Sequence, residues 1–155
     1  MEAAKSIKTL SELRKFVPCV DIDPSGVYKY IQICVTLKIK GNTDSTCFIR
    51  GHGKWEYHAE NFEAFQKEIA ANKSLDDLLY KPNDDEEGVK IRGLLKFKCP
   101  GGGRIQHSPT EKKIFVYGYS QSYGQPDHSV ATDLIKEAYP DYLAENITWS
   151  NEGYQ

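Results

Sequence analysis

The sequence predicts a single α/β domain of the α+β type, in which strands and two main helices share one core. Three observations support this fold class. The chain has 155 residues, a length that suits one domain. It is 39% hydrophobic and 27% charged, which is typical of a folded chain and not of a disordered one. Segments with the two-residue period of strands also flank two segments with the period of helices.

The first part of the chain predicts an extension followed by a hairpin. Residues 1–19 are predicted to form a peripheral N-terminal extension with a short helix, which Pro18 would end. Residues 21–26 have the Pro and Gly pattern of a turn. Val27 to Ile39 then alternates apolar and polar residues, which predicts a long strand. Ser45 to Arg50 is predicted to be its short hairpin partner.

Lys29 lies on the apolar face of the predicted long strand. A buried ammonium group without a partner is costly, so this side chain should reach the end of the sheet or meet an anion. Two partners remain open, namely an anionic ligand and a carboxylate of the protein itself.

The connection from Arg50 to Glu60 leads into a helix predicted for Ala59 to Ala71. Tyr57 and His58 fall at the start of this helix, where backbone N–H groups are unpaired and the helix dipole favours an anion. A histidine can also carry a proton near neutral pH. The segment therefore suits chemistry on a phosphoryl group. On these residues alone, a solvent-facing histidine at a helix start is the simpler interpretation.

A second glycine-rich segment follows a predicted strand at Leu95 to Cys99. The glycines at 101–103 could bring backbone N–H groups close to a ligand, or they could make a tight connection to a strand at Ile105 to His107. Arg104 adds a planar cation that matches phosphate geometry. Residues 72–93 before this strand are the least ordered part of the chain by composition. Residues 74–79 could form one short helix, and residues 81–88 are predicted to form an acidic, solvated loop.

The C-terminal part predicts a strand, a loop, a helix and a closing strand. The strand Lys113 to Ser120 runs into a loop rich in Gly and Ser, which offers donors for phosphoryl oxygens or is an ordinary strand end. The helix is predicted for Thr132 to Tyr139, with Thr132 as its cap. His128 precedes this helix and is the second candidate for a catalytic histidine. Ile147 to Trp149 is predicted to close the sheet.

Composition excludes several classes of function. The net charge of −2 argues against a broad basic face for nucleic acids, and no apolar run has membrane-spanning length. The four histidines form no metal-binding pair, so we expect no metal and no cofactor. The four cysteines show no paired spacing, and no signal-peptide core is present, which predicts buried thiols in a cytoplasmic protein. We expect this protein to be a monomer. The cysteines are Cys19, Cys34, Cys47 and Cys99.

Five stretches together resemble the phosphohistidine phosphatase, or janus, family. They occur in the family's order: Asp21–Tyr30; Arg50–Gly51 with Glu56–Glu60; Gly101–Ile105; Lys112–Ser120 with Tyr123–Gly124; and Tyr139–Tyr142 with Thr148–Tyr154. The resemblance implies a compact mixed sheet with a helix on each side, spanning 20–155 with an insertion at about 72–93. It also implies metal-independent hydrolysis of phosphohistidine in proteins.

The resemblance also implies the residues of the site. The essential histidine is His58, in a segment with Tyr57 and Ala59, and the conserved lysine is Lys29. Arg104 is placed near the site. Ser120, Gln121 and Ser122 are placed in the substrate loop.

Phosphoryl transfer needs mainly positioning and charge stabilisation, so one base, one lysine and a set of N–H donors could suffice. His58 would be the general base, or alternatively the nucleophile. Two rivals are a non-catalytic phosphate-binding adaptor with the same pocket, and a nucleotide-binding protein, for which no motif is present.

The sequence departs from the family pattern in four places. The loop His52 to Trp55 has its Lys-Trp pair one position later than usual, and Gln121 with Ser122 replaces a more apolar pair. The insertion at about 72–93 and the longer N-terminal extension are absent from shorter members. The change at Gln121 and Ser122 bears on substrate preference.

Overall fold

The computed structural model of the protein describes residues 13–15, 17–39, 42–71 and 95–151. The predicted insertion at about 72–93 and most of the predicted N-terminal extension lie outside the described residues. Leu13 and Val17, which belong to that extension, are buried in the core within the described part.

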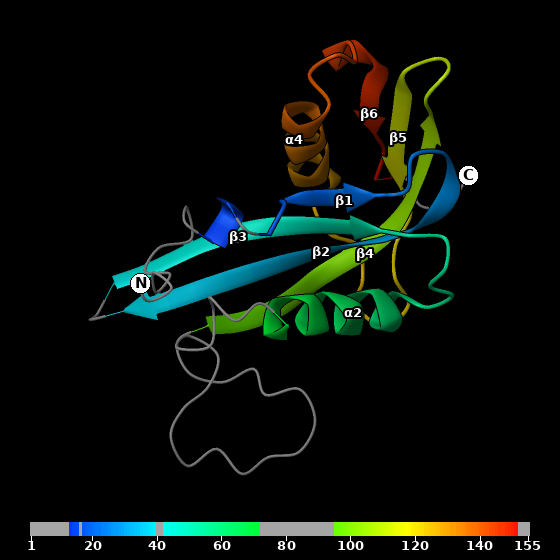
Figure 1. Cartoon of the computed structure of the whole chain (residues 1–155). Helices are drawn as coiled ribbons and strands as arrows, with labels where there is room; N and C mark the ends of the chain where they lie inside the picture. Colours follow the sequence, from blue (N-terminus) through cyan, green and yellow to red (C-terminus); the bar gives the residue numbers. More distant parts are fainter. Residues whose placement is uncertain (1–12, 16, 40–41, 72–94, 152–155) are drawn as a thin grey trace.

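A six-stranded mixed sheet organises the described residues, in the order β1-β3-β2-β4-β5-β6 (Figure 1). The four central strands are antiparallel, and the edge strands β1 and β6 run parallel to their neighbours. The predicted α+β class with a mixed sheet is therefore confirmed. The strands are β1 (Val20–Ile22), β2 (Gly26–Ile39), β3 (Asn42–Gly51), β4 (Leu95–Ser108), β5 (Lys113–Tyr117) and β6 (Ile147–Trp149).

Two helices cover opposite faces of the sheet, as Figure 1 shows. They are α2 (His58–Ala70) and α4 (His128–Ala138), and a short 3-10 helix, η2 (Ala144–Asn146), precedes β6. Successive residues of a strand point to opposite faces, so β2 feeds both cores. Ile31 packs with Phe65 of α2, while Tyr30 packs with Ile135 of α4.

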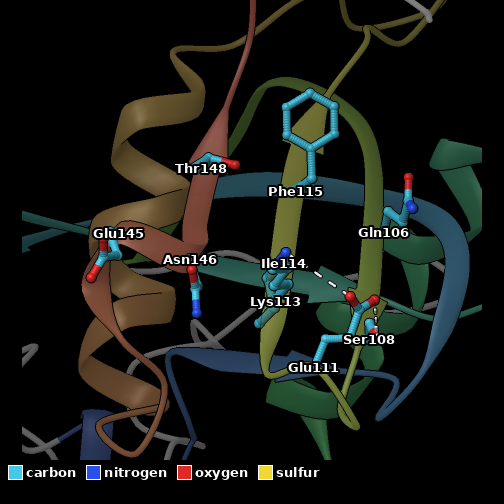
Figure 2. Close-up of a pocket in the computed structure, with 9 residues that line it drawn as sticks. All are labelled: Gln106, Ser108, Glu111, Lys113, Ile114, Phe115, Glu145, Asn146 and Thr148. Atoms are coloured by element: carbon cyan, nitrogen blue, oxygen red, sulfur yellow. Dashed lines mark hydrogen bonds and ion pairs between the residues drawn. The ribbon is translucent and has the colours of Figure 1, made fainter.

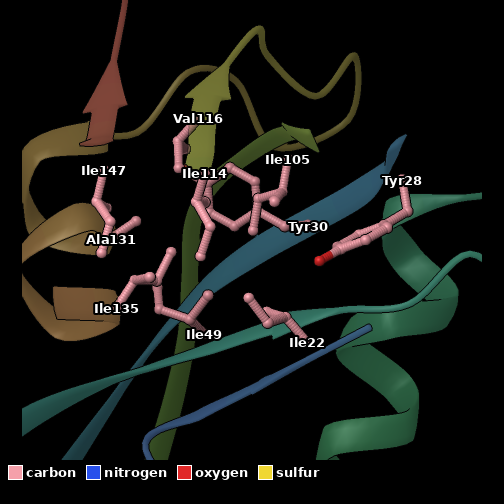
Figure 3. Packing of buried hydrophobic residues seen from close by; sticks show 10 residues of the cluster. All are labelled: Ile22, Tyr28, Tyr30, Ile49, Ile105, Ile114, Val116, Ala131, Ile135 and Ile147. Atoms are coloured by element: carbon pink, nitrogen blue, oxygen red, sulfur yellow. The ribbon is translucent and has the colours of Figure 1, made fainter. Parts of the chain in front are cut away.

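The core under α4 is built from residues of all six strands and the helix (Figure 3). Its buried members are Ile22, Tyr28, Tyr30, Ile49, Ile105, Ile114, Val116, Ala131, Ile135 and Ile147. The core under α2 contains Ile33, Val35, Leu37, Phe48 and Ile69 in addition to Ile31 and Phe65. The two cores hold α2 and α4 on opposite faces of β2 and β4. They therefore determine the position of each helix N-terminus relative to the sheet.

The glycine segment was predicted to connect two separate strands, and this prediction was wrong. β4 is one strand from Leu95 to Ser108, and residues 101–103 pair with Gln32, Ile31 and Tyr30 of β2. The register of this pair shifts between Gln32 and Cys34, just before the glycines. Among the described glycines, positive φ occurs at Gly26, Gly118 and Gly124, so residues 101–103 have ordinary strand backbone. Glycine usually marks a strand break, but here it is required for space, as the site below shows.

The start of the last helix was also predicted wrongly. α4 begins at His128, and its cap is Asp127, whose carboxylate accepts hydrogen bonds from the Ser129 N–H at 3.0 Å and the Ser129 hydroxyl at 2.6 Å. Thr132 lies inside the helix and donates to the Ser129 carbonyl. Both residues are good caps by type, and the earlier one starts the helix. Consequently His128 belongs to the first turn of α4.

Two further corrections concern strands and cysteines. Val20–Ile22 forms β1 beside β3, so the predicted turn at 21–26 begins only after Ile22. Cys34 and Cys47 lie directly opposite each other on β2 and β3, with sulfurs 3.3 Å apart. Sequence spacing did not reveal this pair because hairpin register brings together residues that are distant along the chain. All four cysteines are half-buried.

Arg50 links β3, α2 and the segment before β1. Its side chain is buried, and its guanidinium donates to the Glu68 carboxylate at 3.1 and 3.2 Å and to the Pro18 carbonyl at 2.8 Å. It also lies 4.9 Å from the centre of the Phe65 ring. These contacts join three segments at one buried cation.

Replacing Arg50 by methionine should therefore lower the free energy of unfolding by roughly 2–4 kcal/mol, because buried acceptors lose a charged donor. Urea denaturation measures this change. Lys67→Met is the matched control, since the Lys67–Glu63 pair at 3.6 Å is mostly exposed and should contribute less than about 0.5 kcal/mol. Equal losses in the two variants would contradict the structural role of Arg50.

Candidate functional site

A cavity of about 430 Å³ lies where the start of α2 meets β2, β4 and the loop after β5. It is lined by Lys29, Tyr57, His58, Ala59, Glu60, Arg104, Ser120, Gln121 and Ser122. The site residues that the resemblance implied all lie on this wall, the second candidate histidine His128 does not, and the structure adds Glu60. The fold thus brings together residues from four separate parts of the chain.

His58 is the first residue of α2 and is 6% exposed. Tyr57 caps the helix, and the Glu60 carboxylate accepts the Tyr57 N–H at 2.9 Å. The Nε2 atom of His58 lies 2.9 Å from the Gly103 carbonyl oxygen. A carbonyl can only accept, so Nε2 carries the proton and donates it. No hydrogen bond to Nδ1 from the described residues is present, so Nδ1 keeps its lone pair.

Burial lowers the pKa of His58 below its ordinary value, because the cavity wall disfavours the charged ring. The hydrogen bond to Gly103 acts in the opposite direction, and the cations Lys29 and Arg104 add to the lowering of the pKa. His58 is therefore neutral at pH 7. A neutral imidazole with a free Nδ1 can accept a proton.

The other three histidines have their ring nitrogens engaged. His128 is fully buried, with Nδ1 2.5 Å from the Tyr30 hydroxyl and Nε2 2.8 Å from the Gly118 carbonyl. His107 contacts the Asp23 carbonyl and the Tyr142 hydroxyl, and the His52 ring faces carboxylates. None of the three lines the cavity. His128, the second candidate from the sequence, holds the backbone at Gly118 in place, between β5 and the loop that contains Ser120.

Glycines in β4 make room for the two helix-start histidines. A Cβ atom on Gly102 would lie 2.7 Å from Cδ2 of His58 and 2.5 Å from the Tyr30 carbonyl oxygen. A Cβ atom on Gly103 would lie 2.9 Å from Cε1 of His128 and 2.3 Å from the Tyr117 carbonyl oxygen. All four of these distances are too short for an unstrained contact. Glycine is needed at 102 and 103 because backbone carbonyl oxygens and the two imidazole rings all approach the strand closely there.

Lys29 and Arg104 are direct neighbours on β2 and β4. The Lys29 ammonium donates to the Glu56 carbonyl at 2.6 Å and lies 5.4 Å from the centre of the Tyr57 ring. The carboxylate partner left open from the sequence is absent from the described residues, where no ion pair to Lys29 occurs. The two cations stand at one edge of the cavity, where an anion would meet them.

The loop after β5 is docked onto β4. Ser120 and Gly124 exchange backbone hydrogen bonds at 3.0 and 2.8 Å, and the Gly102 N–H donates to the Gly124 carbonyl at 3.2 Å. Ser120 is buried, and its hydroxyl oxygen accepts the Tyr123 N–H. Gln121 and Ser122 are exposed at the rim of the cavity. The loop is therefore a fixed part of the cavity wall.

Asn61 is a site-supporting residue that the sequence reasoning missed. It is 1% exposed, and its Nδ2 donates to the Lys29 carbonyl at 3.3 Å, which ties the first turn of α2 to β2. Its Oδ1 is buried without a hydrogen bond in the described structure. The sequence could have indicated its burial, because Asn61 lies four residues before Phe65 and eight before Ile69 and so belongs to the same apolar face of the helix.

A second cavity, of about 350 Å³, lies at the other end of β4 and β5 (Figure 2). Two of its charged groups are engaged with each other, since Glu111 lies 3.9 Å from Lys113 and also accepts from the Ser108 hydroxyl. It shares no residue with the His58 cavity. It lacks a histidine or a cluster of cations, so it does not suit phosphoryl chemistry.

Within the described ranges, no three His, Cys, Asp or Glu residues are grouped so that they could hold a metal ion. The helices of the described part are also too short or too polar to span a membrane.

Comparison with known proteins identifies the family. The profile of the Janus/Ocnus family matches residues 14–143. The chain belongs to the Janus/Ocnus family. It is 38% identical over 142 residues to the 14 kDa phosphohistidine phosphatases of Sus scrofa and Homo sapiens, covering 89% of this chain and 93% and 94% of those proteins. It is also 38% identical over 138 residues to the sex-regulated protein janus-A of Drosophila melanogaster, covering 89% of this chain and 82% of that protein.

Proposed function

We propose that this protein is a protein phosphohistidine phosphatase that hydrolyses the P–N bond without a metal ion, with His58 as general base. One observation carries the proposal: a buried, neutral His58 presents an unpaired Nδ1 in a cavity edged by Lys29 and Arg104. The names of the pig and human relatives support the substrate class. In this reaction water attacks phosphorus, the P–N bond breaks, and the leaving imidazole nitrogen takes a proton.

The chain's own residues have distinct roles in this proposal. Nδ1 of His58 accepts a proton from the attacking water, while Nε2–H to Gly103 keeps the ring in that tautomer. Lys29 and Arg104 balance the charge on the phosphoryl oxygens. The N–H of Ala59, in the first turn of α2, and the loop donors at Gln121 and Ser122 hold those oxygens. The negative charge of Glu60 weakens anion binding, although one oxygen of its carboxylate accepts a hydrogen bond from the Tyr57 backbone N–H.

The test of this function is phosphate release from one peptide phosphorylated either on histidine or on serine. We expect turnover of the phosphohistidine form only, because a phosphohistidine ring can be protonated before the P–N bond breaks and then leaves as neutral imidazole. The ester oxygen of phosphoserine is not basic, so serine would have to leave as a strongly basic alkoxide. Tight binding of the phosphohistidine peptide without turnover would instead support the phosphate-binding adaptor. Rapid acid-free quenching with intact-mass measurement separates base from nucleophile, since direct attack by Nδ1 would leave a phosphoryl group on His58.

Lys29 should set the lower pH limit of activity. The neutral form of His58 is the active one, so kcat/KM falls as pH drops through its lowered pKa, below the ordinary histidine value of about 6.5. Lys29→Ala removes a cation that favours the neutral ring, so the acidic limb should move to higher pH and KM should rise.

A pH profile of kcat/KM for Lys29→Ala measures both effects. Lys98→Ala is the matched control, because Lys98 is an exposed β4 lysine that does not line the cavity. An acidic limb that stays in place or moves to lower pH in Lys29→Ala would contradict this role.

A further inference from the structure

We propose that a second subsite, formed around Val27 and Trp55, binds an apolar side chain that flanks the phosphohistidine in the substrate chain. The inference rests on the proposed function and extends it to substrate sequence. A depression of about 200 Å³ adjoins the phosphate cavity and shares Lys29 and Arg104 with it. Its lining is completed by Val27, Tyr28, Gly53, Trp55 and Glu56. A chain with its phosphoryl group at the cations thus has an adjacent place for a neighbouring residue.

The surface of this depression is mixed, with exposed apolar groups of Val27 and Trp55 beside charged residues. Val27 is 56% exposed although it lies in a strand, and Trp55 is partly exposed. The ring of Tyr28 is buried, and its hydroxyl is used in a hydrogen bond to the Asp23 carbonyl at 2.7 Å. Two large apolar groups are therefore left facing solvent beside a phosphate-binding cavity. Covering them removes apolar area from water, which favours an apolar side chain in this position.

The neighbouring charges do not provide a site for a charged side chain. The Lys29 ammonium is engaged by the Glu56 carbonyl, and together with Arg104 it faces the phosphate cavity. Glu56 and the nearby Asp23 would repel an acidic residue, while Lys29 and Arg104 would repel a basic one. An uncharged apolar residue avoids both costs.

Trp55 is held in position without a ligand. The Asp23 carboxylate accepts the Gly53 backbone N–H at 2.7 Å and lies 3.1 Å from His52 Nδ1. The backbone N–H of Trp55 donates to the His52 carbonyl at 3.2 Å. The Lys54 ammonium lies 5.0 Å from the centre of the Trp55 ring. These contacts fasten the loop that carries Trp55 to the turn before β2. A surface that is ordered in advance loses less entropy when it binds.

The first test compares histidine-phosphorylated peptides that differ only at the residues flanking the phosphohistidine: leucine, glycine, aspartate or lysine. We expect kcat/KM for the leucine peptide to exceed that of the glycine peptide by about tenfold, as for other single apolar contacts. Val27→Asp and Trp55→Ala should each reduce the ratio of kcat/KM between the leucine and glycine peptides to about one. Leu143→Asp and Trp149→Ala are the matched controls, since these residues are 62% and 43% exposed and lie outside the depression, and they should keep the ratio.

The second test does not depend on turnover. In His58→Ala with Trp149→Phe, Trp55 is the only tryptophan left in the chain. The phosphohistidine peptide with leucine should change its fluorescence in a saturable way, and the glycine peptide should bind about tenfold more weakly.

The outcomes distinguish the two proposals. Failure of the wild-type protein to hydrolyse any of the peptides would overturn the proposed function. Hydrolysis of all peptides with no leucine advantage, or with a leucine advantage that survives Val27→Asp and Trp55→Ala, would overturn the subsite alone. A preference for the aspartate or lysine peptide would likewise contradict the apolar occupant.

Discussion

His58→Ala is expected to reduce kcat for phosphohistidine hydrolysis by roughly 10²–10⁴-fold, the usual contribution of a positioned general base. Of the four histidines, His58 is the one whose ring lines the cavity and has a nitrogen free of hydrogen bonds in the described structure. The other three rings are engaged by Tyr30, Asp23 and their neighbours. The proton acceptor in the cavity is therefore lost with this one side chain.

The measurement is single-turnover phosphate release, with circular dichroism to show that the variant is folded. His52→Ala is the control, because this histidine lies in the same connection and faces Asp21 and Asp23 outside the cavity. We expect its turnover to stay within a few-fold of wild type. Wild-type turnover in a folded His58→Ala protein would show that another group takes the proton.

Gly102→Ala should damage both stability and turnover. The added Cβ would lie 2.5 Å from the Tyr30 carbonyl oxygen and 2.7 Å from Cδ2 of His58, so either β2 or the imidazole must move. Overpacking of this kind costs roughly 1–3 kcal/mol of stability. Displacement of His58 by a fraction of an ångström should also lower kcat, by up to about a hundredfold. Urea denaturation and phosphate release measure the two effects.

A double-mutant cycle identifies which contact is responsible. In the His58→Ala background the clash with the imidazole is gone, so Gly102→Ala should cost at least about 0.5 kcal/mol less stability than in wild type. Gly53→Ala is the control, because its nearest contact is a movable Asp23 carboxylate oxygen at 3.3 Å. Equal costs of Gly102→Ala in both backgrounds would show that His58 does not pack against Gly102 as described.

The strands and helices with a clear period could be predicted from the sequence. The long alternating run became β2, and the stripe of Phe65 and Ile69 became the buried face of α2. β4 was divided wrongly because three glycines usually interrupt a strand. The reason for these glycines is tertiary. Backbone atoms of neighbouring segments approach all three, and histidine rings from two helices also approach Gly102 and Gly103. These contacts involve residues distant along the chain, so the local sequence does not predict them.

The composition of the cavity was more predictable than its internal geometry. Lys29, His58 and Arg104 could be named from the resemblance, and the fold places them on one wall. The protonated nitrogen of His58 could not be named, because it depends on the carbonyl of Gly103, 45 residues away. The cross-strand approach of Cys34 and Cys47 was missed for the same reason, since register decides it.

Phosphate release by the wild-type protein in excess chelator tests the central claim most directly. The substrate is a peptide phosphorylated on histidine, and the measurement is single-turnover release of inorganic phosphate at pH 7. The described residues offer no grouped metal ligands, whereas His58, Lys29 and Arg104 supply a base and two cations. We predict that the rate equals the rate without chelator and disappears in His58→Ala. Loss of release in chelator, restored by adding one divalent ion, would contradict the account.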